Sequence, residues 1–249
     1  MRDAASEAQE VFNRACEHTR SFALQAEVAW QRETDFMSFS ESQLLREAAW
    51  VILCSGFREA TVRRMFDHIS LCFCDWESAQ SICIDGQKCV MAAKASMNSE
   101  AKLNAILGCA TIVCEQGFGA FKAAVLEDPV VQLQRLPFVG PVTVWHLAKN
   151  LGLNVAKPDR HLARLAEKCG YHSAEELCQD LAVRNGEKVK VVDLILWRYL
   201  AHVAGGALHC SLDEGGNGLL QPFIARSAAH RQKKFQGQSD QLLCSPGGR

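Results

Sequence analysis

Apolar residues recur at intervals of three and four along almost the whole chain, and this periodicity constrains the fold more than any other feature. A clear example lies between residues 41 and 55, where one helix face collects Leu44, Leu45, Ala48, Ala49, Val51 and Ile52. Strand-like alternation of apolar and polar residues never persists for long. The sequence therefore predicts an all-α fold.

Capping residues and glycines set the expected helix boundaries. Ser40 or Ser42 should cap the helix at 41–55, and Ser173 with Glu176 three residues later forms a capping box. Residues 4–31 are predicted to form one long amphipathic helix or a broken one, and residues 70–98 only short pieces. Further helices are expected near 59–68, 99–117, 119–126, 129–135, 141–151, 159–169, 174–182 and 189–204.

The composition excludes several classes of protein. The chain has 249 residues, 48% of them hydrophobic, and a net charge of −1, which is unlike a wholly disordered protein. No uninterrupted apolar run reaches the ~18 residues of a membrane-spanning helix, and the first ten residues are too polar for a secretory signal. We therefore expect a cytoplasmic protein without a membrane partner, nucleoid-associated in a bacterium or nuclear in a eukaryote.

Positive charge is concentrated in two segments. Residues 135–168 contain six Lys or Arg against two Asp or Glu, and residues 226–249 contain five against one, so each segment carries +4. Overall neutrality argues mildly against a nucleic-acid partner, but one basic face remains compatible with it. The polar composition after about residue 228 predicts a flexible basic tail over 226–249.

Twelve cysteines are scattered singly along the chain, without a Cys-x-x-Cys pair. Their spacing suits neither a structural zinc site nor an iron–sulfur cluster, so we expect no metal. Most are interpreted as small buried hydrophobic residues in a reducing compartment. A zinc site formed by tertiary contact stays open as an alternative, with Cys16 and His18 or His209 and Cys210 as the candidate ligands.

A Pro/Gly-rich turn at 136–141 lies between two predicted helices and carries the main functional signal. Its backbone N–H groups would stand at a helix N-terminus, where they can bind a phosphate oxygen. Gly140 would let the backbone approach such a ligand closely. Asp159 follows at the start of another helix, beside Lys157 and Arg160, and a carboxylate in that setting stays ionised and can stabilise a developing cation. A plain helix N-cap is the alternative role for Asp159.

The segments Leu136-Pro-x-Val-Gly140-x-x-Thr143 and Pro158-Asp159-x-x-Leu162 resemble the helix-hairpin-helix (HhH-GPD) superfamily of DNA glycosylases. The resemblance covers residues 40–205 at the level of the superfamily, without a subfamily. It implies an all-α, two-lobed fold with a DNA cleft between the lobes. It also implies that the enzyme flips a damaged, modified or mismatched base out of duplex DNA and hydrolyses its N-glycosidic bond.

The resemblance also implies roles for individual residues. Asp159 would stabilise an oxocarbenium-like sugar and assist the attack of water. Strand-cutting relatives carry a lysine at the position of Val142, so a monofunctional glycosylase without Schiff-base chemistry is expected. The family's iron–sulfur loop is absent, and the carbonyl groups of Leu136 and Phe138 are candidate ligands for a monovalent cation.

The remaining site predictions concern DNA contacts and the base pocket. Phe57 and Arg58 lie where the family inserts a wedge into the DNA, although Phe57 could equally belong to the core. The aromatic residues Trp50, Trp145 and Trp197 are candidates for a base pocket. The other expected DNA contacts are Phe138, Val139, Gly140, Val142, Thr143, Lys157 and Arg160.

We expect four regions and a monomer that binds duplex DNA. Residues 1–39 would form an N-terminal helix packed with the C-terminal lobe, and 40–152 a helical barrel that ends in the hairpin. Residues 153–225 would form the C-terminal helical lobe that carries Asp159, followed by the tail 226–249. Two alternatives stay open, namely a non-catalytic helix-hairpin-helix DNA-binding module and a metalloprotein or redox sensor built on the cysteines.

Overall fold

The computed structural model describes residues 4–206, which form helices and no strand, so the all-α prediction is confirmed for this part of the chain. The helices are α1 (Ala4–His18), α2 (Phe22–Glu33), α3 (Glu41–Cys54), α4 (Glu59–Cys72), the 3-10 helix η1 (Cys74–Trp76), α5 (Ala79–Asp85), α6 (Gln87–Ala93), α7 (Glu100–Gln116), α8 (Phe118–Glu127), α9 (Pro129–Leu133), α10 (Thr143–Asn150), α11 (Arg160–Lys168), α12 (Ala174–Asn185) and α13 (Val189–Gly206).

Local capping explains several of these boundaries. The predicted helix at 4–31 is broken at residues 19–21, where the Thr19 hydroxyl donates a hydrogen bond to the Cys16 carbonyl and Ser21 is extended. The predicted N-caps are present, because Ser40 accepts from the Gln43 N–H and Ser173 from the Glu176 N–H. The capping box is incomplete, since the Glu176 carboxylate accepts the His172 N–H and not that of Ser173. A side chain that satisfies a free N–H group in the first turn stabilises the start of a helix.

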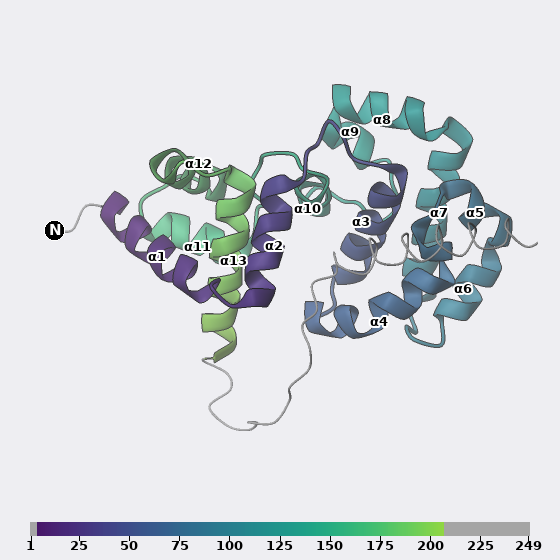
Figure 1. Cartoon of the computed structure of the whole chain (residues 1–249), viewed down its shortest axis with the longest axis horizontal. Coiled ribbons are helices and arrows are strands. Elements are labelled where there is room, and N and C mark those ends of the chain that lie inside the picture. Colours follow the sequence, from purple (N-terminus) through teal and green to yellow (C-terminus); the bar gives the residue numbers. More distant parts are fainter. Residues whose placement is uncertain (1–3, 207–249) are drawn as a thin grey trace, which may run out of the picture.

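The buried apolar residues form two separate hydrophobic cores. The larger core collects residues between 36 and 151, with Phe66, Phe73 and Trp76 among its largest side chains. The smaller core combines residues 8–28 with residues 156–196. Figure 1 shows α1, α2, α11, α12 and α13 on one side of the molecule and α3 to α9 on the other, with α10 between them.

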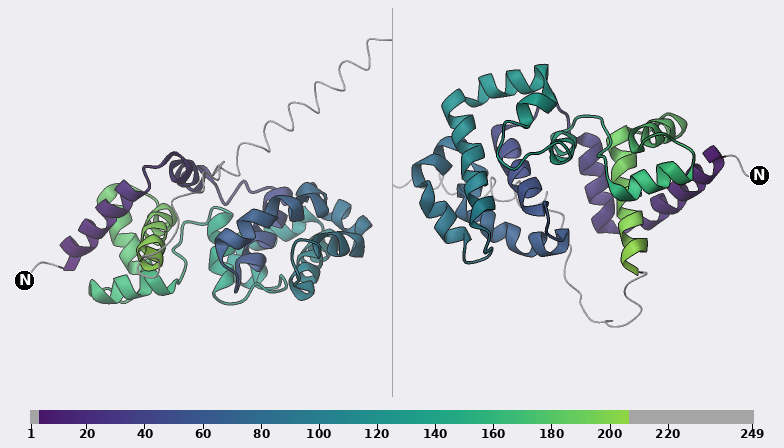
Figure 2. Two further views of the ribbon diagram at one scale, coloured as in Figure 1. Left: turned by 90° about the horizontal axis from the view of Figure 1, so that it is seen from below. Right: turned by 180° about the vertical axis from the view of Figure 1, so that it is seen from behind.

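The two N-terminal helices, α1 and α2, therefore belong to a different core from α3, the next helix in the sequence. Helices α1 and α2 lie against α13 at the other end of the described chain, as both views in Figure 2 show. Phe12 and Val28 are buried in the smaller core, whereas Phe36 and Phe39 belong to the larger one. The chain thus passes from one core to the other in the short connection between α2 and α3.

The cysteines are less buried than expected. Of the ten in the described part, Cys89, Cys109, Cys169 and Cys178 are buried, five are half-buried and Cys114 is exposed. All ten are free thiols. The prediction that most cysteines are buried is therefore wrong for the described residues, since half of these cysteines are only partly covered by neighbouring side chains.

Over residues 4–206, no single helix is both long and apolar enough to cross a membrane. Helices α7 and α8 reach that length and apolarity only when taken together, and they are bent by 99° where they meet.

Gly152 is required where the chain leaves α10. Its φ of +111° is rarely adopted by residues with a side chain, and a Cβ atom there would lie 2.5 Å from the backbone nitrogen of Phe36. Neither the backbone at Asp35 nor that at Phe36 can move aside without disturbing the passage between the two cores.

We predict that Gly152→Ala lowers the free energy of unfolding by about 2 kcal/mol or more, because it combines backbone strain with overpacking. Gly119→Ala is the matched control, since a Cβ atom there meets nothing within 4 Å and the residue lies in α8. Urea titration of the two variants measures the difference. Equal stability of both would contradict the structural requirement at Gly152.

Candidate functional site

The predicted hairpin is present as the connection between α9 and α10. Leu136 and Val139 point into the larger core, and the Val139 N–H donates to the Leu136 carbonyl at 3.1 Å. Phe138 has a left-handed φ of 63° and a side chain that is 51% exposed. The DNA contact expected from Val139 stays a prediction for its backbone, because its side chain is only 4% exposed and packs in the larger core.

The N-terminus of α10 faces open space. Val142 occupies the N-cap position without a side-chain cap, and its own side chain is 56% exposed. A Cβ atom at Gly140 would meet nothing within 4 Å, so a ligand can approach the backbone there. The Val144 N–H donates to the Gly140 carbonyl at 2.9 Å, whereas the N–H groups of Val142 and Thr143 donate to no described group and are available to an anion.

A buried ion pair anchors the other end of α10. The Lys149 ammonium pairs with one carboxylate oxygen of Asp193 on α13, and both side chains are almost completely buried. The second carboxylate oxygen accepts the backbone N–H of Lys157 at 2.9 Å. Asp193 of α13 therefore holds both α10 and the connection that leads from α10 to Asp159.

Two amides join α10 to the neighbouring helices. The buried Gln31 of α2 donates to the Lys149 carbonyl at 3.0 Å, and Asn150 donates to the Glu47 carboxylate of α3 at 2.9 Å. Burial raises the pKa of Glu47, while Arg46 and Asn150 oppose that rise. These contacts place α10 at the junction of the two cores.

Asp159 is the N-cap of α11. One of its oxygens accepts the His161 N–H at 2.7 Å, and its other oxygen bonds to no residue of the described chain. The capping role that was the alternative for this residue is therefore present, and it leaves half of the carboxylate available. Asp159 does not line the cavity described next, whereas Lys157, two residues earlier, does.

A cavity of about 530 Å³ lies between the elements that carry the two cores. Its aromatic wall includes Trp30, Trp50, Trp197 and Phe57, and Val142 and Thr143 line its edge at the hairpin. Trp145, predicted for a base pocket, does not line this cavity, because its side chain packs against the larger core.

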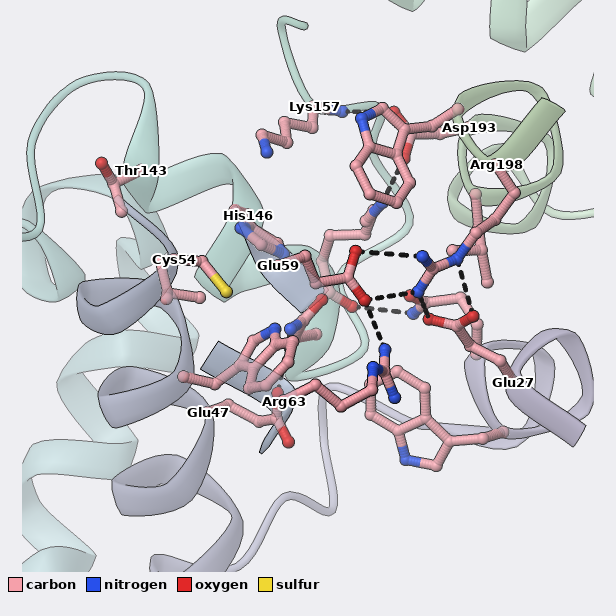
Figure 3. Close-up of a pocket in the computed structure, with 18 of the residues that line it drawn as sticks. Glu27, Glu47, Cys54, Glu59, Arg63, Thr143, His146, Lys157, Asp193 and Arg198 are labelled. Carbon is pink, nitrogen blue, oxygen red and sulfur yellow. Dashed lines mark hydrogen bonds and ion pairs between the residues drawn. The ribbon is translucent and has the colours of Figure 1, made fainter. Parts of the chain in front are cut away.

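Four charged side chains cross the cavity in a single network. Arg198 of α13 donates to Glu27 of α2 at 2.5 and 2.8 Å and to Glu59 of α4 at 2.9 Å, while Arg63 also pairs with Glu59 (Figure 3). Burial alone would raise the pKa of Glu59, but Arg198 and Arg63 outweigh it and hold that pKa below its ordinary value. Glu59 therefore stays ionised, and the network connects helices that belong to different cores.

Lys102 holds the loop predicted to be a wedge. Its ammonium caps α3 by donating to the carbonyl groups of Ile52 at 2.6 Å and of Ser55, where cations are favoured. The same ammonium lies 4.9 Å from the ring centroid of Phe57, which is 42% exposed and lines the cavity. Arg58 is exposed at the start of α4, so both predicted wedge residues remain accessible.

Burial and neighbouring positive charges lower the pKa values of two residues on the hairpin side of the cavity, His146 and Lys157. Burial, followed by the fields of Lys157 and Lys149, lowers the pKa of His146 well below its ordinary value, so this imidazole is neutral at neutral pH. Burial and Lys149 also lower the pKa of Lys157, although Asp159 and Asp193 oppose that change. Arg160, in contrast, is exposed on α11.

Sequence reasoning missed Lys102, the pairing of Lys149 with Asp193 and the network around Arg198. A signal existed, because Lys190, Asp193 and Arg198 interrupt the most apolar stretch of the chain. Charged residues on an apolar helix face are seldom buried unless they are paired. That signal indicates a partner without naming it, since the partner lies on a distant segment.

Comparisons of the chain with protein-family models, curated proteins and solved structures give no match. Within residues 4–206, no group of three or more His, Cys, Asp or Glu side chains could hold a metal ion. His18 lies against His202 and Tyr199, while His209 and Cys210 fall outside the described residues.

We predict that Asp193→Ala lowers the free energy of unfolding by about 3 kcal/mol, because it leaves the buried Lys149 ammonium without its partner. Glu100→Gln, which breaks the exposed pair with Lys94, should change it by less than about 1 kcal/mol. Denaturant unfolding of the two variants makes the comparison. A small effect of Asp193→Ala would show that the junction does not depend on this ion pair.

Proposed function

We propose that this protein is a DNA N-glycosylase that hydrolyses the N-glycosidic bond of a damaged, modified or mismatched base flipped out of duplex DNA. The observation that carries the proposal is the aromatic cavity, which is lined by Val142 and Thr143 at the hairpin and by Lys157, two residues before Asp159. The helical groups around the two cores would be the lobes of a two-lobed HhH-GPD fold, with DNA bound across them as a complex with one protein chain.

The hairpin would bind a DNA phosphate. The first-turn N–H groups of α10 lack a side-chain cap, and Gly140 leaves room for close approach. Phe138 and Val142 expose apolar side chains beside these groups, and Arg160 adds an exposed positive charge. Phosphate contacts of this kind position the duplex without reading its sequence.

The resemblance to glycosylases also implies a monovalent cation at the hairpin. Carbonyl oxygens suit such an ion, and the Leu136 carbonyl retains a lone pair beside its bond to the Val139 N–H. No described group donates to the Phe138 carbonyl. These two carbonyls fit the ion, which would supply positive charge for a DNA phosphate.

The cavity would receive the flipped base. Its volume falls within the 300–1,000 Å³ typical of small-molecule sites, and aromatic faces such as those of Trp50 and Trp197 stack on bases. Phe57, held by Lys102 at the cavity edge, would fill the space that the base leaves in the duplex. The choice of base would depend on the polar groups of the cavity that contact the edge of the flipped base.

Asp159 would supply the electrostatic part of the reaction. Its free carboxylate oxygen would stabilise positive charge on the sugar and accept a proton from the attacking water. Val142 stands where strand-cutting relatives carry their lysine, and its side chain cannot form a Schiff base. The proposal is therefore a monofunctional glycosylase, which leaves an abasic site.

The test is excision from a panel of duplexes, each with one lesion or modified base, with and without alkali treatment. Wild type should give strand cleavage only after alkali, and Asp159→Asn should reduce excision at least about 100-fold, because it removes the charge. Asn also caps helices, so the stability of this variant should be unchanged. Asp128→Asn is the matched control, since Asp128 caps α9 through the Val131 N–H.

Two outcomes would overturn the proposal. Duplex binding without excision of any base, and with binding equal or tighter in Asp159→Asn, would indicate a non-catalytic helix-hairpin-helix module instead. Equal losses in the Asp159→Asn and Asp128→Asn variants would reduce Asp159 to a structural cap.

A further inference from the structure

Lys157 differs from the other cations that line the cavity. Lys149 is paired with Asp193, Arg198 with Glu27 and Glu59, Arg63 with Glu59, and Arg46 with Glu47. The Lys157 ammonium, in contrast, makes no hydrogen bond or ion pair with any residue between 4 and 206. Its three N–H donors are therefore available to a ligand in the cavity.

The position of Lys157 is nevertheless fixed. Its backbone N–H is held by Asp193, and its side chain lines the cavity. Figure 3 shows this side chain directed away from the Arg198 network, on the side of the cavity where Thr143, His146 and Cys54 lie. A cation anchored at its backbone and unpaired at its tip is placed to meet an acceptor atom.

The titratable groups that act on Lys157 come from three helices and from its own segment. His146 and Lys149 lie on α10, Cys54 on α3, Asp193 on α13, and Asp159 two residues further along the chain. His146 is neutral at neutral pH, and burial raises the pKa of the Cys54 thiol to about 12, so neither competes as an acid or a counter-ion. Asp159 favours the charged form of Lys157.

We propose that the Lys157 ammonium is the acid that protonates the departing base, an inference that rests on the proposed function. As the C1′–N bond breaks, its electron pair passes to the base, and a proton moves from Nζ to a nitrogen or oxygen atom of the base. A water molecule forms the new C1′–O bond and gives its proton to Asp159. Proton exchange with solvent then restores both side chains.

Several features favour this role over attack by the amine. The nearby Asp159 carboxylate stabilises the ammonium, and only the neutral amine is a nucleophile. Burial and Lys149 lower the Lys157 pKa from its ordinary value, which makes the ammonium a stronger acid than a solvated lysine. A lysine with a lowered pKa is well suited to proton transfer.

The test uses the duplex that wild type excises and compares single-turnover rates of Lys157→Met and Lys157→Arg. Both variants should lose about 100-fold or more in rate, because methionine has no proton to give and guanidinium does not release its proton. Lys94→Met, which alters an exposed ion pair, should leave the rate unchanged. DNA dissociation constants should change far less than the rate for either Lys157 variant.

The pH profile separates proton donation from a structural role. The acid acts only while protonated, so the wild-type rate should fall as the pH rises through the Lys157 pKa, and this alkaline fall should be absent in Lys157→Met. Among the bases that wild type excises, the Lys157→Met substitution should reduce the excision rate least for the most acidic base, because that base departs as an anion most readily.

The outcomes separate this inference from the proposed function. Failure of wild type to excise any base overturns both. Excision by wild type with an unchanged rate in Lys157→Met, or full rate in Lys157→Arg, overturns the role of Lys157 as an acid alone. Covalent trapping of wild type, but not of Lys157→Met, on DNA by borohydride would make Lys157 a nucleophile instead. That result would overturn its role as an acid and the monofunctional assignment, but not base excision itself.

Discussion

The ion pair between Lys149 and Asp193 is the interaction on which the arrangement of the site depends. It is buried at the junction of the two cores, and Asp193 uses its second oxygen to hold the Lys157 backbone. A buried ion pair adds little net stability compared with apolar packing, but it demands one geometry. Here that geometry sets the hairpin helix, the connection after it and α13 relative to one another.

Polar contacts carry the rest of the junction as well. Lys190 at the start of α13 donates to the carbonyl groups of Gly152 and Thr34, and so ties the ends of α10 and α2 together. The Arg198 network spans the cavity in the same way. Because hydrogen bonds and ion pairs are directional, this junction specifies orientation, while the two apolar cores supply most of the cohesion.

Periodicity and capping predicted the helices and the hairpin, because both signals are local in sequence. The site was predicted only in part. Trp50 and Trp197, predicted for a base pocket, line the cavity, whereas Trp145 packs against the larger core. Phe57 and Lys157, predicted as DNA contacts, also line the cavity, and the Val139 side chain is in the larger core. Periodicity shows which face of a helix is apolar without showing whether that face meets a core or a cavity. The partner of Asp193, 44 residues away at Lys149, is likewise invisible to any local pattern.

The make-up of the two cores has a consequence for synthesis on the ribosome. The larger core is drawn from one continuous stretch, so it can form as soon as residue 151 has left the exit tunnel. The smaller core joins residues 8–28 to residues 156–196, so α1 and α2, although made first, must wait for α13. The cavity takes walls from both groups and is completed last. A nascent chain that stops before α13 would therefore contain the hairpin but not the complete cavity.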